Sequence, residues 1–381
     1  MKKVAIFTGL DIRSFGGGEK YAIEMSNRLK KVDITFFSYR SGGEHRLSEA
    51  EVQKLTRSRI VYYNAIHVPV LVGRLPLTIS ALLAIHSLGE YDVIYNYDPS
   101  LSTNLMLLSF AWFHHKKYIF GMHDPDPLKE SPVIGTPLRS AASGVYNLFR
   151  NIVVRMIPNV RIVNDTERAS LSRIGYKGRV YSISDFINTS PSARDIKVNS
   201  KKFIVIFANR LSVLHKGVDL LCRVVEEVLE KNGNVYFRIA GAGGDGEPRV
   251  KALSEKYPRN VQVLGFLKER ELVKEYINSS LVISTSRFES FGLSIAEAQS
   301  FGLPAVSFDN KGSRAVLKKA FQGKLIKELD ITEFAGAILD YYNAWHSRRI
   351  TLGLKRKISN EVIGRYSAEA VLPAVEKMFL E

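Results

Sequence analysis

Short runs of apolar residues recur along the chain and alternate with longer stretches in which apolar positions are spaced three or four residues apart. The runs expected to form strands are residues 2–9, 32–39, 91–97, 117–123, 160–165, 202–210, 235–241, 261–266, 281–286 and 303–309. Several of them are apolar on both faces, which is typical of strands buried inside a parallel sheet. Helical patterns such as 17–31 and 218–233 lie between strands. This alternation predicts an α/β protein with parallel sheets.

One polar segment interrupts the alternation. Residues 188–202 (NTSPSARDIKVNSKK) contain a proline and show no hydrophobic period, so we expect them to link two domains. We place one doubly wound domain at 1–190 and a second at 200–365. The last segment, 366–381, predicts one more amphipathic helix.

The composition bears on size and compartment. The chain has 381 residues, of which 45% are hydrophobic and 24% charged, and this suits a globular protein with two domains. Its single cysteine, Cys222, excludes a disulfide framework and favours a reducing, cytoplasmic compartment. The apolar run at 4–10 is too short for a signal peptide, and prolines and charges interrupt the stretch at 68–88, so we expect no membrane span.

The net charge of +16 predicts an anionic partner: nucleic acid, an acidic membrane surface or a phosphorylated small molecule. The sequence contains no helix-turn-helix signature, RNA-recognition aromatics or zinc-ligand spacing, which argues against nucleic acid. Residues 131–159 are apolar with isolated arginines at 139, 150 and 155. A basic amphipathic helix of this kind can lie on an anionic membrane, but a helix that faces the core with an arginine edge explains the pattern equally well.

Two segments have the residue types that bind phosphate. FGGGEK at 15–20 follows the first strand and opens a helix, so Gly17 and Gly18 would let a ligand approach free backbone N–H groups. A flexible turn is the alternative. Arg210 and Lys216 lie in the loop after the first strand of the second domain. Two cations at that edge of a parallel sheet suit a diphosphate. We favour this interpretation over ordinary surface charge.

The stretch RFESFGLSIAEAQSFGLP at 287–304 places Glu289 before a predicted helix at 293–300 and Glu297 within it. Free N–H groups at the start of that helix favour an anion, and carboxylates accept hydrogen bonds from pairs of hydroxyl groups. We therefore expect a ligand with a phosphate in the middle and polyols at both ends, as in a sugar nucleotide. The alternative is a capping glutamate with a solvent-facing one.

His123 ends a predicted strand of the first domain, where it could contact a substrate hydroxyl, although a lone histidine is often structural. Asp124 and Asp126 follow it as a D-x-D pair. Such a pair can signal a metal that bridges a diphosphate, but the flanking prolines make a rigid turn an equally good explanation, and the cations at 210 and 216 make a metal less necessary.

Together these segments resemble the retaining GT-B glycosyltransferases of family 4 over nearly the whole chain. The matching segments are GGGE at 16–19, FGMHD at 120–124, Arg210 to Lys216-Gly217, IAGAGGD at 239–245, VQVLGFL at 261–267 and, most specific of all, the E-x7-E motif from Glu289 to Glu297. The resemblance implies two Rossmann-like, doubly wound parallel-sheet domains that face a central cleft, with the helix at 366–381 crossing back onto the first domain.

What the family implies for single residues is carried over by motif. Arg210 and Lys216 would hold the diphosphate, Glu297 the ribose, and Glu289 and His123 the donor sugar, and these residues except Glu297 would be catalytic. The full set of donor-binding residues would be Gly17, Gly18, Arg210, Lys216, Gly241, Gly265, Phe266, Leu267, Glu289, Phe291, Gly292, Leu293 and Glu297.

The resemblance further implies transfer of a hexose from a nucleotide-diphosphate sugar to a glycan, glycolipid or lipid-linked acceptor, with no metal and no cofactor besides that co-substrate. We expect a cytoplasmic protein with peripheral contact to the inner face of an anionic membrane, and no nucleic-acid partner. Two departures from the family leave the donor sugar open. SISDFIN at 182–188 replaces a Pro-Asn-Gly loop, and NKGSRAVL at 310–317 lacks a glutamate near Ala315.

Two alternatives remain at this point. The chain could be a GT-B epimerase or phosphorylase, or a non-catalytic carbohydrate- or nucleic-acid-binding scaffold. An absorbance scan for pyridoxal phosphate would identify a phosphorylase, and donor turnover above background would argue against a scaffold.

Overall fold

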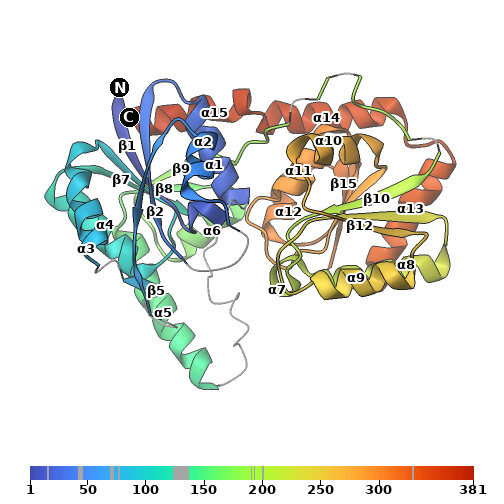
Figure 1. Ribbon diagram of the computed structural model, residues 1–381, viewed down its shortest axis with the longest axis horizontal. Coiled ribbons are helices and arrows are strands. Elements are labelled where there is room, and N and C mark those ends of the chain that lie inside the picture. The colour runs from blue at the N-terminus through green and yellow to red at the C-terminus, as the bar shows by residue number, and fades with distance from the viewer. Residues whose placement is uncertain are drawn as a thin grey trace. The chain divides into compact units, whose positions relative to one another are not determined.

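The computed structural model describes residues 1–14, 17–41, 46–68, 73–75, 78–122, 137–189, 191–192, 194–199, 201–327 and 330–381. The chain forms two compact units (Figure 1). Unit 1 comprises Met1–Asp185 together with Val371–Glu381, and unit 2 comprises Phe186–Ala370.

Unit 1 is built on a seven-stranded sheet in the order β3-β2-β1-β6-β7-β8-β9, and every neighbouring pair is parallel. The strands are β1 (Lys2–Phe7), β2 (Val32–Tyr39), β3 (Arg59–Tyr63), β6 (Val93–Asn96), β7 (Lys117–Met122), β8 (Asn159–Ile162) and β9 (Arg179–Ser182). The order along the chain reverses at β1, which pairs with both β2 and β6. Ligands of such open sheets bind outside the carboxyl ends of the strands at this reversal.

Among the described residues of unit 1, six helices connect its strands: α1 (Gly17–Arg28), α2 (Glu49–Leu55), α3 (Ile79–His86), α4 (Leu101–Phe113), α5 (Pro137–Met156) and α6 (Asp165–Arg173). The short elements η1 (Ile12–Ser14), η2 (Ser87–Glu90) and the antiparallel pair β4 (Ile66–Val68) and β5 (Gly73–Leu75) complete it. Helices α3, α4 and α5 cover the same face of the sheet, because Ala81, Leu107 and Val154 share one core with Phe7 and Phe120.

Unit 2 has a six-stranded parallel sheet in the order β12-β11-β10-β13-β14-β15. Its strands are β10 (Phe203–Ala208), β11 (Val235–Ala240), β12 (Val261–Gly265), β13 (Leu281–Ser284), β14 (Ala305–Phe308) and β15 (Gly323–Ile326). Its helices are α7 (Val213–Lys216), α8 (Val218–Lys231), α9 (Glu247–Lys256), α10 (Glu269–Asn278), α11 (Leu293–Ser300), α12 (Lys311–Val316), η3 (Ala320–Gln322), α13 (Ile331–His346) and α14 (Leu352–Tyr366). The reversal falls at β10, between β11 and β13.

The last helix, α15 (Ala368–Leu380), returns the chain to unit 1. Its carbonyl groups accept hydrogen bonds from lysines of the unit 1 sheet: Lys2 Nζ lies 2.5 Å from Leu380 O, and Lys117 Nζ lies 2.7 Å from Met378 O. Lysines at the C-terminus of a helix satisfy its last carbonyl groups and oppose the negative end of its dipole.

The predicted fold class is confirmed, and each of the ten predicted strands is present. The sequence patterns missed the short β4–β5 pair and, in the two large sheets, β3, β9 and β15. The last three are edge strands of their sheets, and they begin Arg59, Arg179 and Gly323-Lys324. An edge strand is only partly buried and often has charged residues, so its apolar run is short and resembles a loop.

Candidate functional site

The side chains of unit 2 that the sequence predicts to bind phosphate and sugar lie at the carboxyl edge of its sheet. Lys216 ends α7, in the connection after β10, and its Nζ lies 2.6 Å from Oε2 of Glu289, in the connection after β13. Both side chains are about one-fifth exposed, at 19% and 18%. A lysine has three N–H donors, so two remain for a ligand oxygen beside the carboxylate. Arg210 is exposed in the same connection, and its guanidinium has no hydrogen bond or ion pair to another described residue.

The turn that presents Lys216 depends on Gly217, which follows it. Gly217 has a left-handed conformation (φ 63°), and the Thr285 hydroxyl donates to the carbonyl groups of Lys216 at 2.9 Å and Gly217 at 3.0 Å. A Cβ atom built on Gly217 would lie 2.1 Å from Thr285 O. No side chain therefore fits at position 217 without displacing the turn from the end of β13.

We expect Gly217→Ala to lower the free energy of unfolding by at least about 1–2 kcal/mol, because alanine is strained in the left-handed region and its Cβ collides with Thr285 O. Urea titration measures the loss. Gly233→Ala is the matched control, since a Cβ built there meets no atom within 4 Å. Equal stability of the two variants would contradict this account of the turn.

The E-x7-E stretch folds as predicted around the start of α11, whose bounds match the expected 293–300 helix. Gly292 precedes the helix in a left-handed conformation (φ 87°), and no side chain caps the helix N-terminus. The amides of Ile295 and Ala296 bond to Gly292 O, which leaves the first amides of the helix to attract an anion. The backbone of Glu289 is held by Gly312, whose amide donates to Glu289 O at 2.7 Å.

Phe291 differs from its neighbours in the motif. Its side chain is buried and packs edge-on against Tyr366, with the ring centroids 5.0 Å apart. The residue therefore anchors α11 to the core, and its backbone is the part that remains for a ligand.

Glu297 lies on α11, one turn beyond the helix start, and is half-buried. Tyr276 of α10 is buried near it. Burial, and then the Glu297 carboxylate, raise the pKa of the Tyr276 hydroxyl well above its usual value. The hydroxyl thus stays protonated beside the carboxylate. Sequence reasoning missed Tyr276, which no motif marks.

The glycine-rich connections after β11 and β12 form the other side of this edge. Gly241 donates from its amide to Gly265 O at 2.8 Å, and a Cβ built on Gly241 would lie 1.8 Å from Asn209 O. Phe266 follows with an exposed ring, and Leu267 is half-buried. The close approach of three strand ends explains the glycine at 241.

Two further residues of this edge were not expected from the sequence. The Asn209 amide nitrogen is buried without a partner among the described residues, and its Oδ1 lies 3.4 Å from the Ser294 hydroxyl at the start of α11. Arg287, in the connection after β13, forms a bidentate pair with Asp219 of α8, at 2.8 and 2.7 Å. Asn209 lies at the end of the predicted strand 202–210, and Arg287 is the first residue of the 287–304 stretch, so no motif marked either of them.

In unit 1, Gly17 and Gly18 begin α1, and a Cβ built on Gly18 would meet nothing within 4 Å. His123, Asp124 and Asp126 lie outside the residues that the structure describes. Within the described ranges, no group of three His, Cys, Asp or Glu side chains could hold a metal ion.

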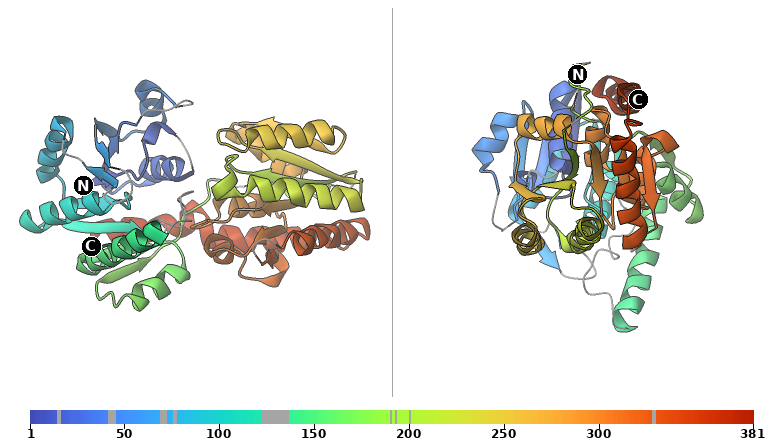
Figure 2. Two further views of the ribbon diagram at one scale, coloured as in Figure 1. Left: turned by 90° about the horizontal axis from the view of Figure 1, so that it is seen from below. Right: turned by 90° about the vertical axis from the view of Figure 1, so that its right-hand side faces the viewer.

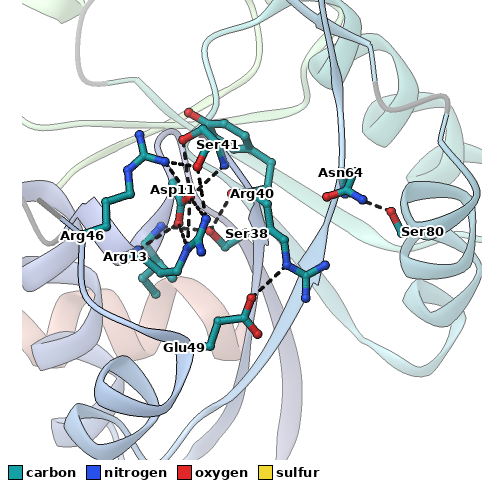
Figure 3. Close-up of polar contacts among 11 residues, drawn as sticks. Asp11, Arg13, Ser38, Arg40, Ser41, Arg46, Glu49, Asn64 and Ser80 are labelled. Atoms are coloured by element: carbon teal, nitrogen blue, oxygen red, sulfur yellow. Dashed lines mark hydrogen bonds and ion pairs between the residues drawn. The ribbon is translucent and has the colours of Figure 1, made fainter. Parts of the chain in front are cut away.

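Three arginines gather at the carboxyl edge of the unit 1 sheet (Figure 3). We call Arg13, Arg40 and Arg46 the arginine cluster. Arg13 and Arg46 both contact the buried Asp11, at 2.7 and 3.4 Å, while Arg40 pairs with Glu49 at 2.9 Å. Burial opposes ionisation of Asp11, but hydrogen bonds from Arg13 and Ser41 outweigh it and lower its pKa.

The cluster therefore places three guanidinium groups against two carboxylates. Arg13 and Arg46 each have a side chain about one-fifth exposed, and that of Arg40 is more exposed still. Guanidinium groups with free N–H donors are suited to bind phosphate or carboxylate. This edge of unit 1 can hold an anion.

A further arginine of unit 1, Arg161 on β8, is fully buried. Its guanidinium donates to the hydroxyls of Tyr21, Tyr95 and Tyr97, to the carbonyls of Ile183 and Ser184, and to Asp185 Oδ1, all between 2.8 and 3.1 Å. It ties the segment that replaces the family's Pro-Asn-Gly loop to α1 and β6. A charge inside the apolar run VRIV was the signal that could have revealed it.

The comparisons with known proteins agree with this architecture. Two parallel-sheet α/β units of this topology define the GT-B fold. Among solved structures, sucrose-phosphate synthase from Thermosynechococcus elongatus superposes with a TM-score of 0.76 at 15% identity, covering 100% of this chain and 98% of that chain. Residues 190–351 match the family model of the glycosyl transferases group 1. This match agrees with the resemblance that the sequence motifs carry.

Two curated relatives are similar in part. Poly(ribitol-phosphate) alpha-N-acetylglucosaminyltransferase of Staphylococcus aureus is 28% identical over 218 residues, which are 57% of this chain and 42% of that relative. D-inositol 3-phosphate glycosyltransferase of Corynebacterium jeikeium is 30% identical over 158 residues, 39% of this chain and 38% of the relative. The matched part spans less than half the length of either protein.

Proposed function

We propose that the protein is a retaining hexosyltransferase, which moves a hexose from a nucleotide-diphosphate sugar to a glycan, glycolipid or lipid-linked acceptor. The observation that carries the proposal is the Lys216–Glu289 pair beside the uncapped N-terminus of α11, with Glu297 one turn farther along. A cation, free amides and two carboxylates supply groups for a phosphate with a polyol on each side. The match of residues 190–351 to the glycosyl transferases group 1 supports it.

The donor would then be divided among these groups. Lys216, Arg210, the first amides of α11 and the unpartnered Asn209 amide bind the diphosphate. Glu297 accepts hydrogen bonds from the ribose, and Glu289 from the sugar. The exposed Phe266 ring, at the far side of the same edge, offers a stacking surface to the base.

The reaction breaks the bond between the anomeric carbon and the diphosphate oxygen and forms a bond from that carbon to the acceptor oxygen. The acceptor hydroxyl proton passes to the departing diphosphate, on the same face of the sugar, so the anomeric configuration is retained without a protein nucleophile. Lys216 and Arg210 stabilise the charge that develops on the leaving diphosphate, which is electrostatic catalysis by fixed groups.

We propose further that the acceptor is anionic and meets the arginine cluster of unit 1. The names of both curated relatives contain a phosphorylated polyol. Guanidinium groups at the carboxyl edge of a parallel sheet suit such a phosphate.

The donor proposal predicts that Glu297→Ala weakens nucleotide-sugar binding by about 10- to 100-fold, the cost of losing hydrogen bonds to a charged group. A thermal-shift screen of UDP-, GDP- and ADP-sugars finds the donor, since a ligand that binds only the folded state raises apparent stability. Titration of the two proteins with that donor then gives the ratio.

Glu230→Ala is the control, because Glu230 is exposed on α8, away from this edge. Release of nucleotide diphosphate from the donor, with and without acceptor, tests turnover in the same samples. A protein that neither shifts with any of these donors nor turns them over is a binding scaffold or has other chemistry, and the proposed function then fails.

A further inference from the structure

Unit 1 exposes large apolar side chains on its outer helix layer. Of the seventeen large hydrophobic residues exposed in the described parts of the chain, ten lie on α3, α4 and α5. They are Ile79, Leu82, Leu83, Leu105, Trp112, Phe113, Leu148, Phe149, Ile152 and Met156. We call them the outer apolar face. Exposure reaches 79% at Ile79, 72% at Trp112 and 71% at Phe113.

Two of these helices turn small residues toward the sheet and expose large apolar residues on the opposite side. A helix that covers a sheet normally turns its large apolar residues inward and its polar residues outward. In α3, the small Ala81 and Ala84 pack onto the sheet, whereas Leu82 and Leu83 point away from it. In α4, Ala111 packs inward while the next two residues, Trp112 and Phe113, are exposed.

Helix α4 also has no charged residue along its thirteen positions. In α3, the only titratable side chain is His86, at the end of the helix. A helix whose outer side presents large apolar residues and no charge is usually covered on that side as well. The sheet covers one side of these helices (Figures 1 and 2), so the other side requires a second apolar surface.

The charges near this face indicate the chemistry of that surface. Helices α3, α4 and α5 contain neither aspartate nor glutamate, and the first acid after α3 is Glu90. The charges they do have are basic: Arg139, Arg150 and Arg155 lie on α5, and Lys116 follows α4. Aromatic and aliphatic side chains bordered by cations, with no acids among them, suit the interface of an anionic bilayer.

We propose that the outer apolar face docks unit 1 onto the surface of an anionic lipid membrane. No helix in the described residues is long and apolar enough to span a bilayer, so α3, α4 and α5 would lie in the interfacial layer. Trp112 and Phe113 insert among the headgroups, and the basic residues face lipid phosphates. The proposal adopts the membrane-facing interpretation of the 131–159 pattern. It also assigns α3 and α4, which the sequence had not marked, to the same membrane surface. It does not depend on the transfer reaction.

Flotation of the full chain with lipid vesicles tests the proposal. Vesicles of phosphatidylcholine mixed with phosphatidylglycerol are expected to carry the protein, and vesicles of phosphatidylcholine alone to carry much less. Raising the salt concentration should weaken binding, because the cations contribute through a screened interaction. The double variant Leu83→Glu/Phe113→Glu should bind the mixed vesicles at least about tenfold more weakly, since two charges enter the interface.

Leu352→Glu is the matched control, because Leu352 is an exposed leucine at the start of α14 in unit 2. Its binding should equal that of the parent protein. Circular dichroism and the nucleotide-sugar thermal shift verify that each variant is folded and that its donor site is intact.

Fluorescence gives a second, site-specific readout. The chain has two tryptophans, Trp112 and Trp345, so Trp345→Phe leaves the one on the outer apolar face as the sole reporter. Its emission should shift to shorter wavelength on mixed vesicles and be quenched by brominated lipids. A parent protein that fails to float overturns the proposal, as does unchanged binding of the double variant. A dimer that the double variant dissociates, without any flotation, would assign the face to a second copy of the chain instead.

Discussion

Replacing Arg161 by methionine is expected to lower the free energy of unfolding of unit 1 by about 3–5 kcal/mol, the usual cost of breaking a buried charge pair from one side. The guanidinium is 0% exposed, and Asp185 Oδ1 lies 2.9 Å from its Nη2. Methionine fills similar volume but donates no hydrogen bond. It would remove the Arg161 hydrogen bonds to the Asp185 carboxylate and to two backbone carbonyls.

The tyrosines around Arg161 cannot replace it. Burial raises the pKa of Tyr21, Tyr95 and Tyr97, so all three stay neutral hydroxyls. A neutral hydroxyl compensates a buried carboxylate less well than a guanidinium does. The loss should therefore extend to the 183–185 segment, which Arg161 holds to β8.

Urea unfolding measures the loss, with hydrogen exchange of peptides from β6 and β8 to assign the transition to unit 1. Arg179→Met is the control on the neighbouring strand β9. Arg179 pairs with Glu381 at 2.5 Å, but its side chain is more than half exposed, so the expected loss is at most about 1 kcal/mol. An equal loss of unfolding free energy in the two variants would contradict the prediction that the buried Arg161 stabilises unit 1 more than an exposed arginine does.

Replacing Lys216 by methionine is expected to lower kcat about 10²- to 10³-fold, the range seen when one fixed donor to a developing anion is removed. The Nζ of Lys216 is the cation closest to Glu289, at 2.6 Å, and the proposed mechanism assigns it to the departing diphosphate. Lys216→Arg keeps the charge and should recover part of the rate. A loss that came only from a damaged turn would not be recovered in this way.

Steady-state measurement of donor turnover, with the donor identified by thermal shift, gives kcat and KM separately. Lys231→Met is the control, because Lys231 forms an exposed pair with Glu227 on α8 and has no place in the site. Unchanged kcat in Lys216→Met would remove the leaving-group role from this residue. It would also undermine the mechanism proposed for the edge of unit 2.

The sequence predicted much of this site because its residues lie in short, ordered motifs. The helix at 293–300, with Glu289 before it and Glu297 within it, could be placed from local pattern alone, since a Phe-Gly turn precedes it. The roles of these residues toward a ligand stay predictions. Their direct contact does not follow from the pattern, because Lys216 and Glu289 are 73 positions apart and meet only when β10 and β13 lie side by side.

Local order in the chain thus determined the fold class, ten of the strands and the position of the proposed donor-binding motifs. Those features rest on buried, repeated apolar positions, which sequence periodicity reports directly. Only the tertiary structure decided which short runs become edge strands, that Arg161 is enclosed by three tyrosines, and that α3 and α4 leave their large side chains outside. Each of these depends on contacts between segments far apart in the chain. The free energy of burying a charge, or exposing an apolar side chain, is set by neighbours that no local pattern contains.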